Sequence, residues 1–467
     1  MIKSYLFLGF LMTLFFLSTC HQEMTQENTS NMTFTGAKGE VKLITLNPGH
    51  FHAALVQKYR YDQVDSVVAI YAPGGPELTD YLARIKSYNQ RPEAPTNWDS
   101  KTYTGPDFLE KMISDKAGNV VVISGNNAQK MNYIQSSVQA GLNVLADKPM
   151  VIKPADFTVL QTLFPLAQEK GVLLYDIMTE RYEITTMMQR AFSQVPAVFG
   201  ELEKGTPENP AITKESVHHF FKYVSGQPLI RPAWFFDVAQ QGEGIVDVST
   251  HLVDLVLWEC FPEQAIDYTQ DIKVLVGKRW PTEISPEQFQ SVTGLADYPD
   301  YLRKDLVKDS ILQAFSNGEI TFTVHGVHAK VSVIWNYQAP QGAADTHYSI
   351  MRGTKANLVI RQGEAQQYQP VLYVEPISDA AAADLTTAFP EALKKLSEQY
   401  PGLSYQEAEK GWEILIPEEY KTGHEAHFGQ VTQKYLQYLV EGKLPEWEIP
   451  NMLAKYYVTT RAYEMSR

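Results

Sequence analysis

The sequence predicts an α/β protein with two folded domains: a parallel sheet covered by helices, then an α+β domain with a large, mostly antiparallel sheet. Short apolar runs alternate with helical patterns between residues 39 and 178, as they do in βαβ units. Farther along, apolar residues recur at every second position, which is the period of a strand with one buried face. A chain of 467 residues also exceeds the size that one domain core usually serves.

Five apolar runs predict the strands of the first domain, which we place at residues 39–178. Helical patterns separate them, and parallel strands need such crossovers. The predicted strands are residues 42–46, 66–71, 120–124, 144–146 and 172–175. The predicted helices include residues 53–59, 128–140 and 156–170.

The second domain, residues 179–467, combines antiparallel strands with several helices. Turn signals at Asn317-Gly318 and His325-Gly326 accompany the alternating segments. A helix that begins near Gly244 is expected to cover one face of the sheet. An Ala-rich and Glu/Lys-rich segment predicts a helical insertion at residues 379–425. The predicted strands are residues 273–276, 320–324, 331–335, 348–351 and 357–360, and closing helices are expected within residues 428–467.

Residues 1–20 form a separate unit that resembles a bacterial lipoprotein signal peptide with its lipobox. Lys3 gives a positive start, an apolar run too short to span a bilayer comfortably comes next, and Leu17-Ser18-Thr19-Cys20 follows. Lipidation of Cys20 is therefore expected, with a plain secretory signal or an uncleaved anchor as the alternative. Residues 21–38 are polar, as a flexible tether would be. These features predict an exported protein of the bacterial cell envelope, in the periplasm or at the outer membrane.

The charge balance argues against nucleic acid as a partner. Lys and Arg number 40 against 54 Asp and Glu, for a net charge of −14, and no basic block occurs in the chain. This balance suits a neutral ligand. With Cys20 lipidated, Cys260 has no partner for an intramolecular disulfide, so the stability of the fold must come from its core.

Residues 242–254 carry three ionisable groups at one helical spacing. Asp247, His251 and Asp254 stand at i, i+4 and i+7, which places them along one face of a helix, and apolar residues surround them. Such a helix is expected to be buried. Burying an Asp and a His costs free energy unless they are paired or in use. The cluster is therefore either a satisfied polar network or a catalytic acid/base pair.

The turn after the first predicted strand lies where a dinucleotide-binding fold has its G-x-G-x-x-G motif. It reads Asn47-Pro48-Gly49-His50-Phe51-His52 and keeps only the middle glycine, which lets the backbone approach a pyrophosphate. The second strand ends at Tyr71, without the acidic residue that usually holds a ribose hydroxyl. Tyr71 is expected to stack on the adenosine half or to hydrogen-bond it instead.

A lysine lies at the end of a later parallel strand, in Asp147-Lys148-Pro149. This strand follows the segment Ser124-Gly125-Asn126-Asn127 by one βαβ spacing. Ligands of parallel sheets bind at the carboxyl ends of the strands, so Lys148 would point into the crevice where nicotinamide and substrate meet. The alternative is a solvated loop lysine before a proline.

Together these motifs resemble the glucose-fructose oxidoreductase, inositol dehydrogenase and rhizopine-catabolism (Gfo/Idh/MocA) family. The resemblance rests on a Rossmann-type domain with Asp-Lys-Pro after its fifth strand, an antiparallel domain, and G-x-G-x-x-D-x-x-x-H-x-x-D at residues 242–254; it covers residues 39 to about 360. It implies a catalytic triad of Lys148, Asp247 and His251 and a nicotinamide cofactor, NAD or NADP, with NAD favoured. A homo-oligomer formed through the antiparallel sheet is a further implication.

The chain departs from the family pattern at four places. They are the depleted glycine loop, Asp147 where glutamate is commoner, the lack of an acidic residue at Tyr71, and the insertion at residues 379–425. The expected cofactor contacts are Asn47, Pro48, Gly49, His50, Phe51, Tyr71, Ser124, Gly125, Asn126, Asn127, Asp147 and Lys148.

The residue types fit the oxidation of a secondary alcohol, in which a base takes the hydroxyl proton while hydride leaves for nicotinamide. His251 can serve as this base because the ordinary pKa of histidine is about 6.5. Lys148 would stabilise the developing alkoxide, and Asp247 would orient the pair. Asp254 is expected to have a supporting, structural role.

Aromatic and polar residues between positions 179 and 237 predict a carbohydrate site, since sugars present C–H faces to rings and hydroxyls to polar tips. The expected substrate contacts are Arg181, His219 and Trp234, together with Lys148, Asp247 and His251. Core packing is expected for half of the four phenylalanines nearby, Phe220, Phe221, Phe235 and Phe236. No metal is predicted, because no cysteine accompanies the histidines and no H-E-x-x-H motif occurs.

Three functions remain open from the sequence. The first is a nicotinamide-dependent oxidoreductase that acts on a secondary hydroxyl or keto group of a carbohydrate, for example to interconvert a glycoside and its 3-keto form, with a tightly held cofactor. The second is an NAD-dependent glycosidase that uses transient 3-oxidation and elimination. The third is a non-catalytic sugar-binding lipoprotein on a degenerate Rossmann scaffold, which the eroded glycine loop favours and the intact Lys148, Asp247 and His251 disfavour.

Overall fold

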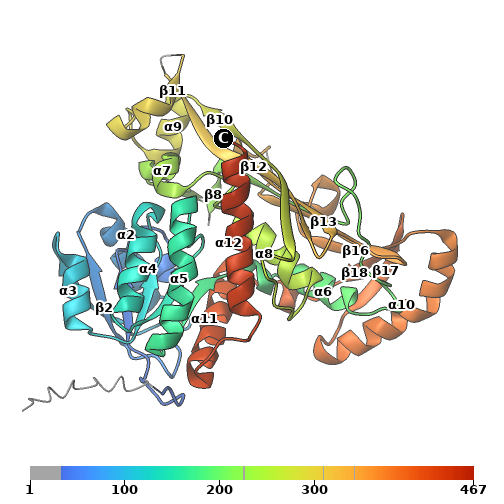
Figure 1. The fold of residues 1–467 in the computed structure, drawn as a ribbon, viewed down its shortest axis with the longest axis horizontal. Helices are drawn as coiled ribbons and strands as arrows, with labels where there is room; N and C mark the ends of the chain where they lie inside the picture. Colours follow the sequence, from blue (N-terminus) through green and yellow to red (C-terminus); the bar gives the residue numbers. More distant parts are fainter. Residues whose placement is uncertain (1–32, 225–226, 309, 341) are drawn as a thin grey trace, which may run out of the picture. The chain divides into compact units, whose positions relative to one another are not determined.

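Six parallel strands form the first sheet, in the spatial order β3-β2-β1-β4-β5-β6 (Figure 1). The computed structural model describes residues 33–224, 227–308, 310–340 and 342–467, so the predicted signal peptide, Cys20 and most of the tether lie outside the described residues. Four of the strands are buried along their whole length, because helices cover both faces of the sheet. The strands are β1 (Leu43–Leu46), β2 (Val67–Ala72), β3 (Asp99–Thr104), β4 (Val120–Ile123), β5 (Asn143–Asp147) and β6 (Leu174–Ile177).

The five strands predicted for this sheet are present. The sequence missed β3, because its residues are polar and mostly exposed at the edge of the sheet, where it pairs with β2 alone. The longer helices of this domain are α2 (Pro76–Gln90), α3 (Phe108–Asp115), α4 (Lys130–Gln139) and α5 (Pro154–Lys170).

Helix α1 (His52–Leu55) is a single turn and ends before the predicted limit at residue 59. Side chains from elsewhere in the domain donate hydrogen bonds to the main-chain carbonyls that follow this helix. Trp98 Nε1 donates to Gln57 O at 2.5 Å, and Arg91 Nη2 donates to Lys58 O at 2.6 Å. These bonds satisfy carbonyl groups beyond the helix end and favour an early turn toward β2.

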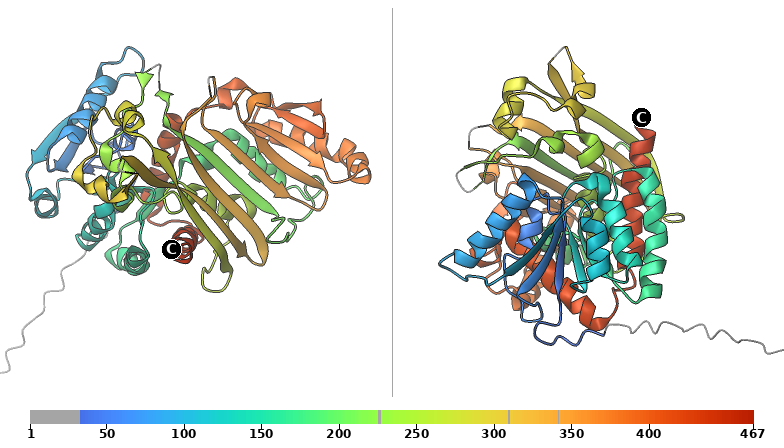
Figure 2. Two further views of the ribbon diagram at one scale, coloured as in Figure 1. Left: turned by 90° about the horizontal axis from the view of Figure 1, so that it is seen from above. Right: turned by 90° about the vertical axis from the view of Figure 1, so that its left-hand side faces the viewer.

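The second sheet has ten strands and is antiparallel except where β7 runs parallel to β13 (Figure 2). Its spatial order is β10-β12-β13-β7-β14-β15-β16-β18-β17, with β11 paired to β12. The predicted fold class, a parallel sheet followed by a domain with a large, mostly antiparallel sheet, is therefore confirmed. The strands are β7 (Ile212–Phe221), β10 (Ile272–Ile284), β11 (Leu306–Val307), β12 (Ile311–Val324), β13 (Val327–Gln338), β14 (Thr346–Arg352), β15 (Ala356–Arg361), β16 (Val371–Pro376), β17 (Ser404–Ala408) and β18 (Gly411–Leu415), and β8 (Tyr223–Val224) pairs separately with β9 (Gln227–Pro228).

Of the two predicted turns in this sheet, His325-Gly326 is found between β12 and β13, and Asn317-Gly318 is wrong. Asn317 lies inside β12. Its Oδ1 accepts from the Trp335 main-chain N–H at 2.7 Å, and its Nδ2 donates to Trp280 O at 3.0 Å. The amide thus bridges the two neighbouring strands, and these side-chain bonds override the turn preference of an Asn-Gly pair.

The helical insertion predicted for residues 379–425 is helical only in its first half. Helix α10 spans Asp379–Gln399, and the hairpin of β17 and β18 that follows it extends the edge of the second sheet. Ile414 is buried, and Trp412 stacks on Phe389 of α10 with ring centroids 5.0 Å apart. Packing of this half-buried strand surface outweighs the charged residues that suggested a helix.

The last two helices complete both domains. Phe428, Val431 and Tyr435 of α11 belong to the same buried cluster as the strands of the first sheet. Helix α12 contacts α5, α8 and β10, so it lies between elements of the two domains (Figure 1). Among the described residues, none of the helices combines the length and apolar character that crossing a membrane requires. The remaining helices are α6 (Ile184–Ser193), α7 (Val238–Gln241), α8 (Ser249–Cys260), α9 (Pro286–Thr293), α11 (His424–Glu441) and α12 (Glu448–Met465).

A buried network of five charged side chains joins the two domains. Arg181, in the 3₁₀ helix η2 (Thr179–Tyr182), donates to both oxygens of Asp254 at 2.7 Å and to Glu448 at 2.8 Å. Lys455 of α12 lies 2.9 Å from Asp254 and 2.8 Å from Asp176 of β6. All five are buried. Ions removed from water need such pairing, because an unpaired buried charge is strongly destabilising.

The network reaches the segment that carries Lys148. Tyr456 of α12 donates its hydroxyl to Asp176 at 2.7 Å and accepts a hydrogen bond from the Met150 main-chain N–H at 3.1 Å. Burial alone would raise the pKa of Asp254, but Arg181 and Lys455 outweigh burial and hold this pKa well below its ordinary value. Asp254 therefore stays ionised at neutral pH and keeps the network charged.

Replacing Asp254 with alanine tests the network. Asp254→Ala is expected to lower the free energy of unfolding by about 3–5 kcal/mol, because it leaves Arg181 and Lys455 buried without this counter-charge. Urea denaturation measures the loss. Asp300→Ala, which removes an exposed ion pair with Arg303, is the control and is expected to leave the free energy of unfolding nearly unchanged. Losses of equal size in the two variants would contradict this account.

Candidate active site

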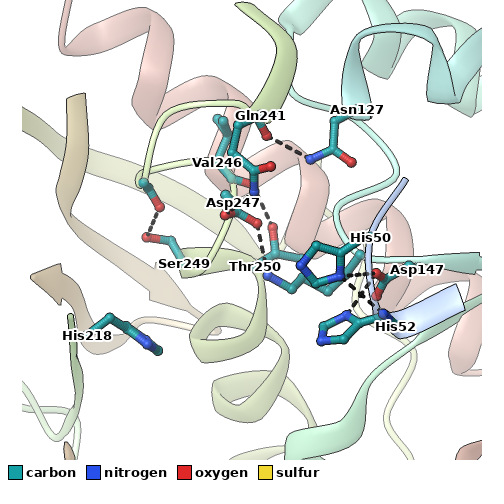
Figure 3. A network of polar contacts seen from close by, with 12 residues as sticks. His50, His52, Asn127, Asp147, His218, Gln241, Val246, Asp247, Ser249 and Thr250 are labelled. Carbon is teal, nitrogen blue, oxygen red and sulfur yellow. Dashed lines mark hydrogen bonds and ion pairs between the residues drawn. The ribbon is translucent and has the colours of Figure 1, made fainter. Parts of the chain in front are cut away.

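Lys148 and Asp247, which belong to separate motifs, meet at the junction of the two domains. Lys148 follows the carboxyl end of β5, and its Nζ lies 2.9 Å from Asp247 Oδ1. Gln241 Nε2 donates to the other carboxylate oxygen, Oδ2, at 2.9 Å (Figure 3). The side chains of Lys148 and Asp247 are only 11% and 9% exposed, so water screens their attraction weakly.

Asp247 lies in a turn before the helix, so the helix predicted from Gly244 begins later, at Ser249. Gly244 packs against β12, where a Cβ would fall 1.7 Å from Ser316 O. Ser249 bonds back to Gly244 O through its N–H at 3.3 Å and its hydroxyl at 3.1 Å. This wide turn, which the close approach to β12 imposes, directs the Asp247 carboxylate toward Lys148.

His251 stands in the first turn of α8 as a neutral imidazole. Burial, followed by the charges of Lys148 and His424, holds the pKa of His251 well below its ordinary value. Its Nδ1 is buried and has no hydrogen-bond partner among the described residues. The Asp247 carboxylate bonds to Lys148 and Gln241. The site thus presents a neutral base with an uncommitted nitrogen within the electrostatic reach of a lysine.

The structure supports the role expected for Asp254 and overturns the substrate role predicted for Arg181. The Arg181 guanidinium uses three N–H groups on Asp254 and Glu448 and is buried. It cannot turn to a substrate without leaving two buried carboxylates unpaired. Its partners lie 73 and 267 positions away along the chain, so no local sequence motif could predict these ion pairs.

The two predicted cofactor loops, after β1 and after β4, touch each other. Gly49 N donates to Ser124 O at 3.1 Å. A Cβ on Gly125 would fall 2.7 Å from Asn47 O, so this approach requires glycine. Asn47 has a φ of 44°, a left-handed conformation that asparagine adopts more readily than most residues. The depleted motif therefore keeps a tight, bare turn at the carboxyl edge of the sheet, which fits the pyrophosphate of a dinucleotide.

The loop after β4 is also tied to the second domain. Asn126 Nδ2 donates to Gln240 Oε1 at 2.6 Å. Asn127 Nδ2 donates to Gln241 O at 2.7 Å (Figure 3). Both glutamines belong to α7, and Gln241 also holds Asp247. A chain of hydrogen bonds thus links a predicted cofactor loop to the Asp247 carboxylate.

The cofactor contact predicted for Tyr71 is wrong. Its hydroxyl donates to Asp115 Oδ2 at 2.9 Å, and its ring lies 6.1 Å from that of Tyr103. The side chain is only 4% exposed. Tyr71 therefore packs against α3 and β3 inside the first domain, and its ring face is not free to stack on an adenosine.

His50, His52 and Asp147 form a cluster at the same edge of the sheet (Figure 3). His52 Nδ1 lies 2.9 Å from Asp147 Oδ2, and His50 Nδ1 lies 3.9 Å from the same oxygen. One nitrogen or oxygen of each residue lies within 4.8 Å of the other two. His52 and Asp147 are 95 positions apart, so motif spacing could not reveal the cluster.

A small pocket beside Asp247 is lined by twelve residues, of which five are aromatic, among them Phe235, Phe315 and Trp335. Of the four phenylalanines in this part of the sequence, two are core residues and two are half-buried, in the proportion expected. The buried pair is Phe220 and Phe236, and the half-buried pair is Phe221 and Phe235.

The predicted substrate contacts His219 and Trp234 are buried, and neither is among the described residues that line this pocket. His219 N and Nδ1 both lie 3.1 Å from Asp345 Oδ1. The preceding residue in β7, His218, is more exposed and stacks on Trp335 with ring centroids 4.9 Å apart. Both histidines contact Asp345, since His218 Nδ1 lies 3.4 Å from Asp345 Oδ2. Of the residues in this paragraph, Trp335 is the one that lines the pocket.

Glu180 is a further titratable group at this edge of the sheet, and no motif singled it out. It lies in η2, just beyond the carboxyl end of β6. Burial, followed by the charge of Glu183, raises the pKa of Glu180 to about 7, and the charge of Lys148 opposes this shift. Glu180 therefore titrates near neutral pH within electrostatic reach of Lys148.

Two family models match the chain. “Oxidoreductase family, NAD-binding Rossmann fold” (GFO_IDH_MocA) matches residues 47–176, and “Putative oxidoreductase C terminal domain” matches residues 188–467. The chain therefore belongs to the Gfo/Idh/MocA family of NAD(P)-dependent oxidoreductases and carries its NAD-binding Rossmann domain. A search of curated proteins finds no match.

Solved structures show the same fold. A protein described as a “putative oxidoreductase” from Parabacteroides merdae ATCC 43184 is 56% identical, with a TM-score of 0.91, over 93% of this chain and 99% of that chain. KijD10, a 3-ketoreductase from Actinomadura kijaniata solved with NADP and TDP-benzene, is 13% identical, with a TM-score of 0.54, over 91% and 98%. GenD2 from gentamicin A biosynthesis, solved with NAD, is 14% identical, with a TM-score of 0.54, over 93% and 96%.

The pKa of Glu180 predicts a specific dependence of stability on pH. Because the folded-state pKa of about 7 exceeds the ordinary value of 4.5, the folded protein binds more protons than the unfolded chain between these values. The stabilisation from the neutral carboxyl is complete below the ordinary pKa and is lost as the pH rises through the folded-state pKa. Glu180→Gln should therefore gain stability relative to the native protein as the pH rises from about 5 to about 8. Urea denaturation across this range measures the difference, and a constant difference would contradict the assignment.

Proposed function

We propose that the protein transfers hydride between a nicotinamide cofactor and a secondary hydroxyl or keto carbon of a carbohydrate. The observation that carries this proposal is the 2.9 Å contact of Lys148 with Asp247 at the carboxyl edge of the cofactor sheet, with the neutral His251 nearby. The aromatic lining of the pocket beside Asp247 suits the C–H faces of a sugar ring. KijD10, which shares the fold, is described as a 3-ketoreductase.

Each residue of the proposed triad has a chemical task. When bound, the nicotinamide accepts the hydride from the carbinol carbon or returns it to the keto carbon. His251 is neutral, so its imidazole can take the hydroxyl proton during oxidation. The Lys148 ammonium donates a hydrogen bond to the oxygen on which negative charge develops. Asp247 fixes the Lys148 ammonium, and Gln241 fixes the Asp247 carboxylate.

The cofactor would be held by the two touching loops. Asn47 and Gly49 offer a bare turn to the pyrophosphate, and the loop of Ser124 to Asn127 supports it. On the opposite side of the reacting carbon, Trp335 and His218 offer a ring surface and a polar edge to the sugar. His218, Trp335 and Gln241 therefore take the place of Arg181, His219 and Trp234 among the proposed contacts of the substrate side.

An elimination mechanism remains the second candidate. The same hydride step could oxidise C3 of a glycoside transiently, acidify the neighbouring C–H bond and allow loss of the aglycone before the hydride returns. The titratable Glu180 near Lys148 favours this candidate, since elimination needs a further acid/base group. Parallel assays of an intact glycoside and a 3-keto-glycoside separate the two, because only the glycosidase releases aglycone from the former. The third reading, a non-catalytic binding protein, conflicts with membership in an oxidoreductase family.

Export makes cofactor supply a constraint, and we propose that the cofactor stays bound through many turnovers. Residues 1–20 resemble a lipoprotein signal, and free nicotinamide dinucleotide is not expected outside the cytoplasm. A retained cofactor would be regenerated when one sugar is oxidised and another, or the enzyme's own product, is reduced. Rapid exchange of bound cofactor with added isotope-labelled NAD would contradict this proposal.

A lipid anchor at Cys20 is proposed on the same sequence feature. Cys20→Ser should abolish the incorporation of labelled fatty acid into the protein, because a thioether-linked lipid needs the cysteine. Metabolic labelling followed by immunoprecipitation measures the loss. No incorporation into the native protein, or undiminished labelling of the variant, would contradict the anchor.

Variants of the triad test the catalytic proposal. Lys148→Met is expected to lower kcat by about 10²–10³-fold, the usual cost of losing one donor to a developing oxyanion. His251→Ala is expected to lower kcat by about 10²–10⁴-fold, because the proton acceptor is lost. Steady-state kinetics with a 3-keto-glycoside as acceptor measures both effects.

Lys153→Met provides the control, since Lys153 is an exposed lysine five positions farther along the chain. Its kcat should match that of the native protein. A Lys148→Met enzyme with native kcat would remove Lys148 from the mechanism. Absence of nicotinamide from the purified protein, together with no binding of added NAD or NADP, would remove the proposed function altogether.

A further inference from the structure

His52 occupies the third glycine position of the eroded G-x-G-x-x-G motif. In that motif the third glycine serves close packing of the helix against the sheet. Here an imidazole fills this place, and its Nδ1 lies 2.9 Å from Asp147 Oδ2, with the two side chains 12% and 6% exposed. The substitution has therefore produced a buried, hydrogen-bonded histidine–carboxylate pair between the cofactor turn and β5.

Asp147 is held by two further elements. Ser124 Oγ, at the end of β4, donates to Asp147 Oδ2 at 2.9 Å. Lys130 Nζ, from α4, donates to the Asp147 main-chain carbonyl at 2.8 Å. Burial alone would raise the pKa of Asp147, but the charge and hydrogen bond of His52, with the charge of Lys130, outweigh burial and hold this pKa well below its ordinary value. The carboxylate is thus ionised, and its Oδ2 is engaged by His52 and Ser124.

Lys148 follows directly and is fixed from both sides. On one side Asp147 is hydrogen-bonded by His52 of the cofactor turn, by Ser124 after β4 and by Lys130 of α4. On the other side Met150 N donates to Tyr456 OH of α12 at 3.1 Å. A side chain between two anchored residues has little backbone freedom, and its ammonium reaches Asp247 at 2.9 Å. The position of Lys148 therefore depends on the contact between His52 and Asp147.

We propose that His52 and Asp147 act together as a positioning pair, which replaces the packing glycine and couples the cofactor-binding turn to Lys148. The proposal rests on the proposed function, since it assigns a cofactor to the turn and a catalytic role to Lys148. It predicts that the two side chains are matched in size. A glutamate at position 147 would push one extra methylene into the imidazole, and a glycine at position 52 would leave the carboxylate without its histidine donor.

A metal site is the competing explanation of this cluster. His50, His52 and Asp147 offer three ligand-type atoms within 4.8 Å of one another, and Asp147 Oδ1 is buried without a hydrogen-bond partner among the described residues. Two ammonium groups argue against a cation here. Lys130 Nζ bonds to the carbonyl of Asp147, and Lys148 is the next residue. Their repulsion is large in a site that excludes water, so the hydrogen-bonded pair is favoured.

A double-mutant cycle on the full-length protein tests the matching of the pair. The variants are His52→Gly, Asp147→Glu and the two combined. The measured quantity is the rate at which NADH leaves the protein into an excess of NAD, followed by NADH fluorescence, together with the melting temperature. Each single variant should release NADH about ten-fold faster, and the double variant should recover at least half of this loss on a logarithmic scale.

Two further variants separate positioning from a general loss of packing. His52→Asn keeps a donor that can reach Asp147 and should release NADH at a rate within about three-fold of the native protein. His424→Ala removes an imidazole that packs 5.1 Å from the His52 ring without bonding to Asp147, and it should leave the release rate nearly unchanged.

The outcomes are distinct. Multiplicative losses in the double variant, or native release rates in both single variants, would overturn the pair. Stoichiometric zinc, iron or manganese in the native protein, lost in His52→Gly, would overturn it in favour of a metal site. If the native protein binds neither NADH nor NADPH, the proposed function fails first and the positioning pair fails with it. If the native protein binds NADH but the effects of the substitutions at positions 52 and 147 on NADH release are independent, the positioning pair is contradicted and the proposed function is not.

Discussion

The buried charges between the domains are the interaction on which the active site depends. Arg181 and Lys455 both pair with Asp254 of α8, and Lys455 also pairs with Asp176 in the first sheet. Because every ion in this network has lost its water, none can move without exposing another to the apolar interior. The network therefore fixes α8 and α12 against the carboxyl edge of the first sheet. Lys148 and Asp247 can then meet, although they belong to different domains.

The charges at the site are balanced, unlike those of the whole chain. The protein carries a net charge of −14, but at the carboxyl edge of the first sheet Lys148 pairs with Asp247, and Lys130 bonds to the main chain of the ionised Asp147. Burial lowers the pKa values of His50 and His251, with His52 as the next cause for His50 and Lys148 for His251, so both imidazoles are neutral. The Lys148 ammonium suits a developing alkoxide, and a neutral imidazole is the form that accepts a proton.

The sequence predicted the fold class because strand periodicity is a local signal, and the resemblance to the family implied that Lys148 and Asp247 share one site. It failed where a contact made over a long sequence separation decides a residue's role. Arg181 was predicted to bind substrate, but its guanidinium donates to Asp254 and Glu448 instead. Tyr71 was predicted to contact the adenosine, but its hydroxyl donates to Asp115 instead.

Two other errors arise from the backbone and from strand direction. Residues 244–248, which were predicted to be helical, form an irregular turn because Gly244 packs closely against β12. The spacing of residues in the sequence does not show this contact. His219 is buried against Asp345 and His218 stacks on Trp335, and these contacts are set by the pairing of β7 within the sheet. These are properties of strand pairing and close packing, and a single sequence does not encode them visibly.

Transfer of deuterium is the most direct measurement of the central claim. The protein would be loaded with NADH that carries deuterium at both C4 positions of the nicotinamide and mixed with a 3-keto-glycoside, and the product would be analysed by NMR. The account predicts deuterium on the former keto carbon of the sugar, delivered by the native protein and nearly abolished when Lys148 is replaced by methionine. A reduced sugar without deuterium at that carbon, or no reduction by a protein that binds NADH, would contradict it.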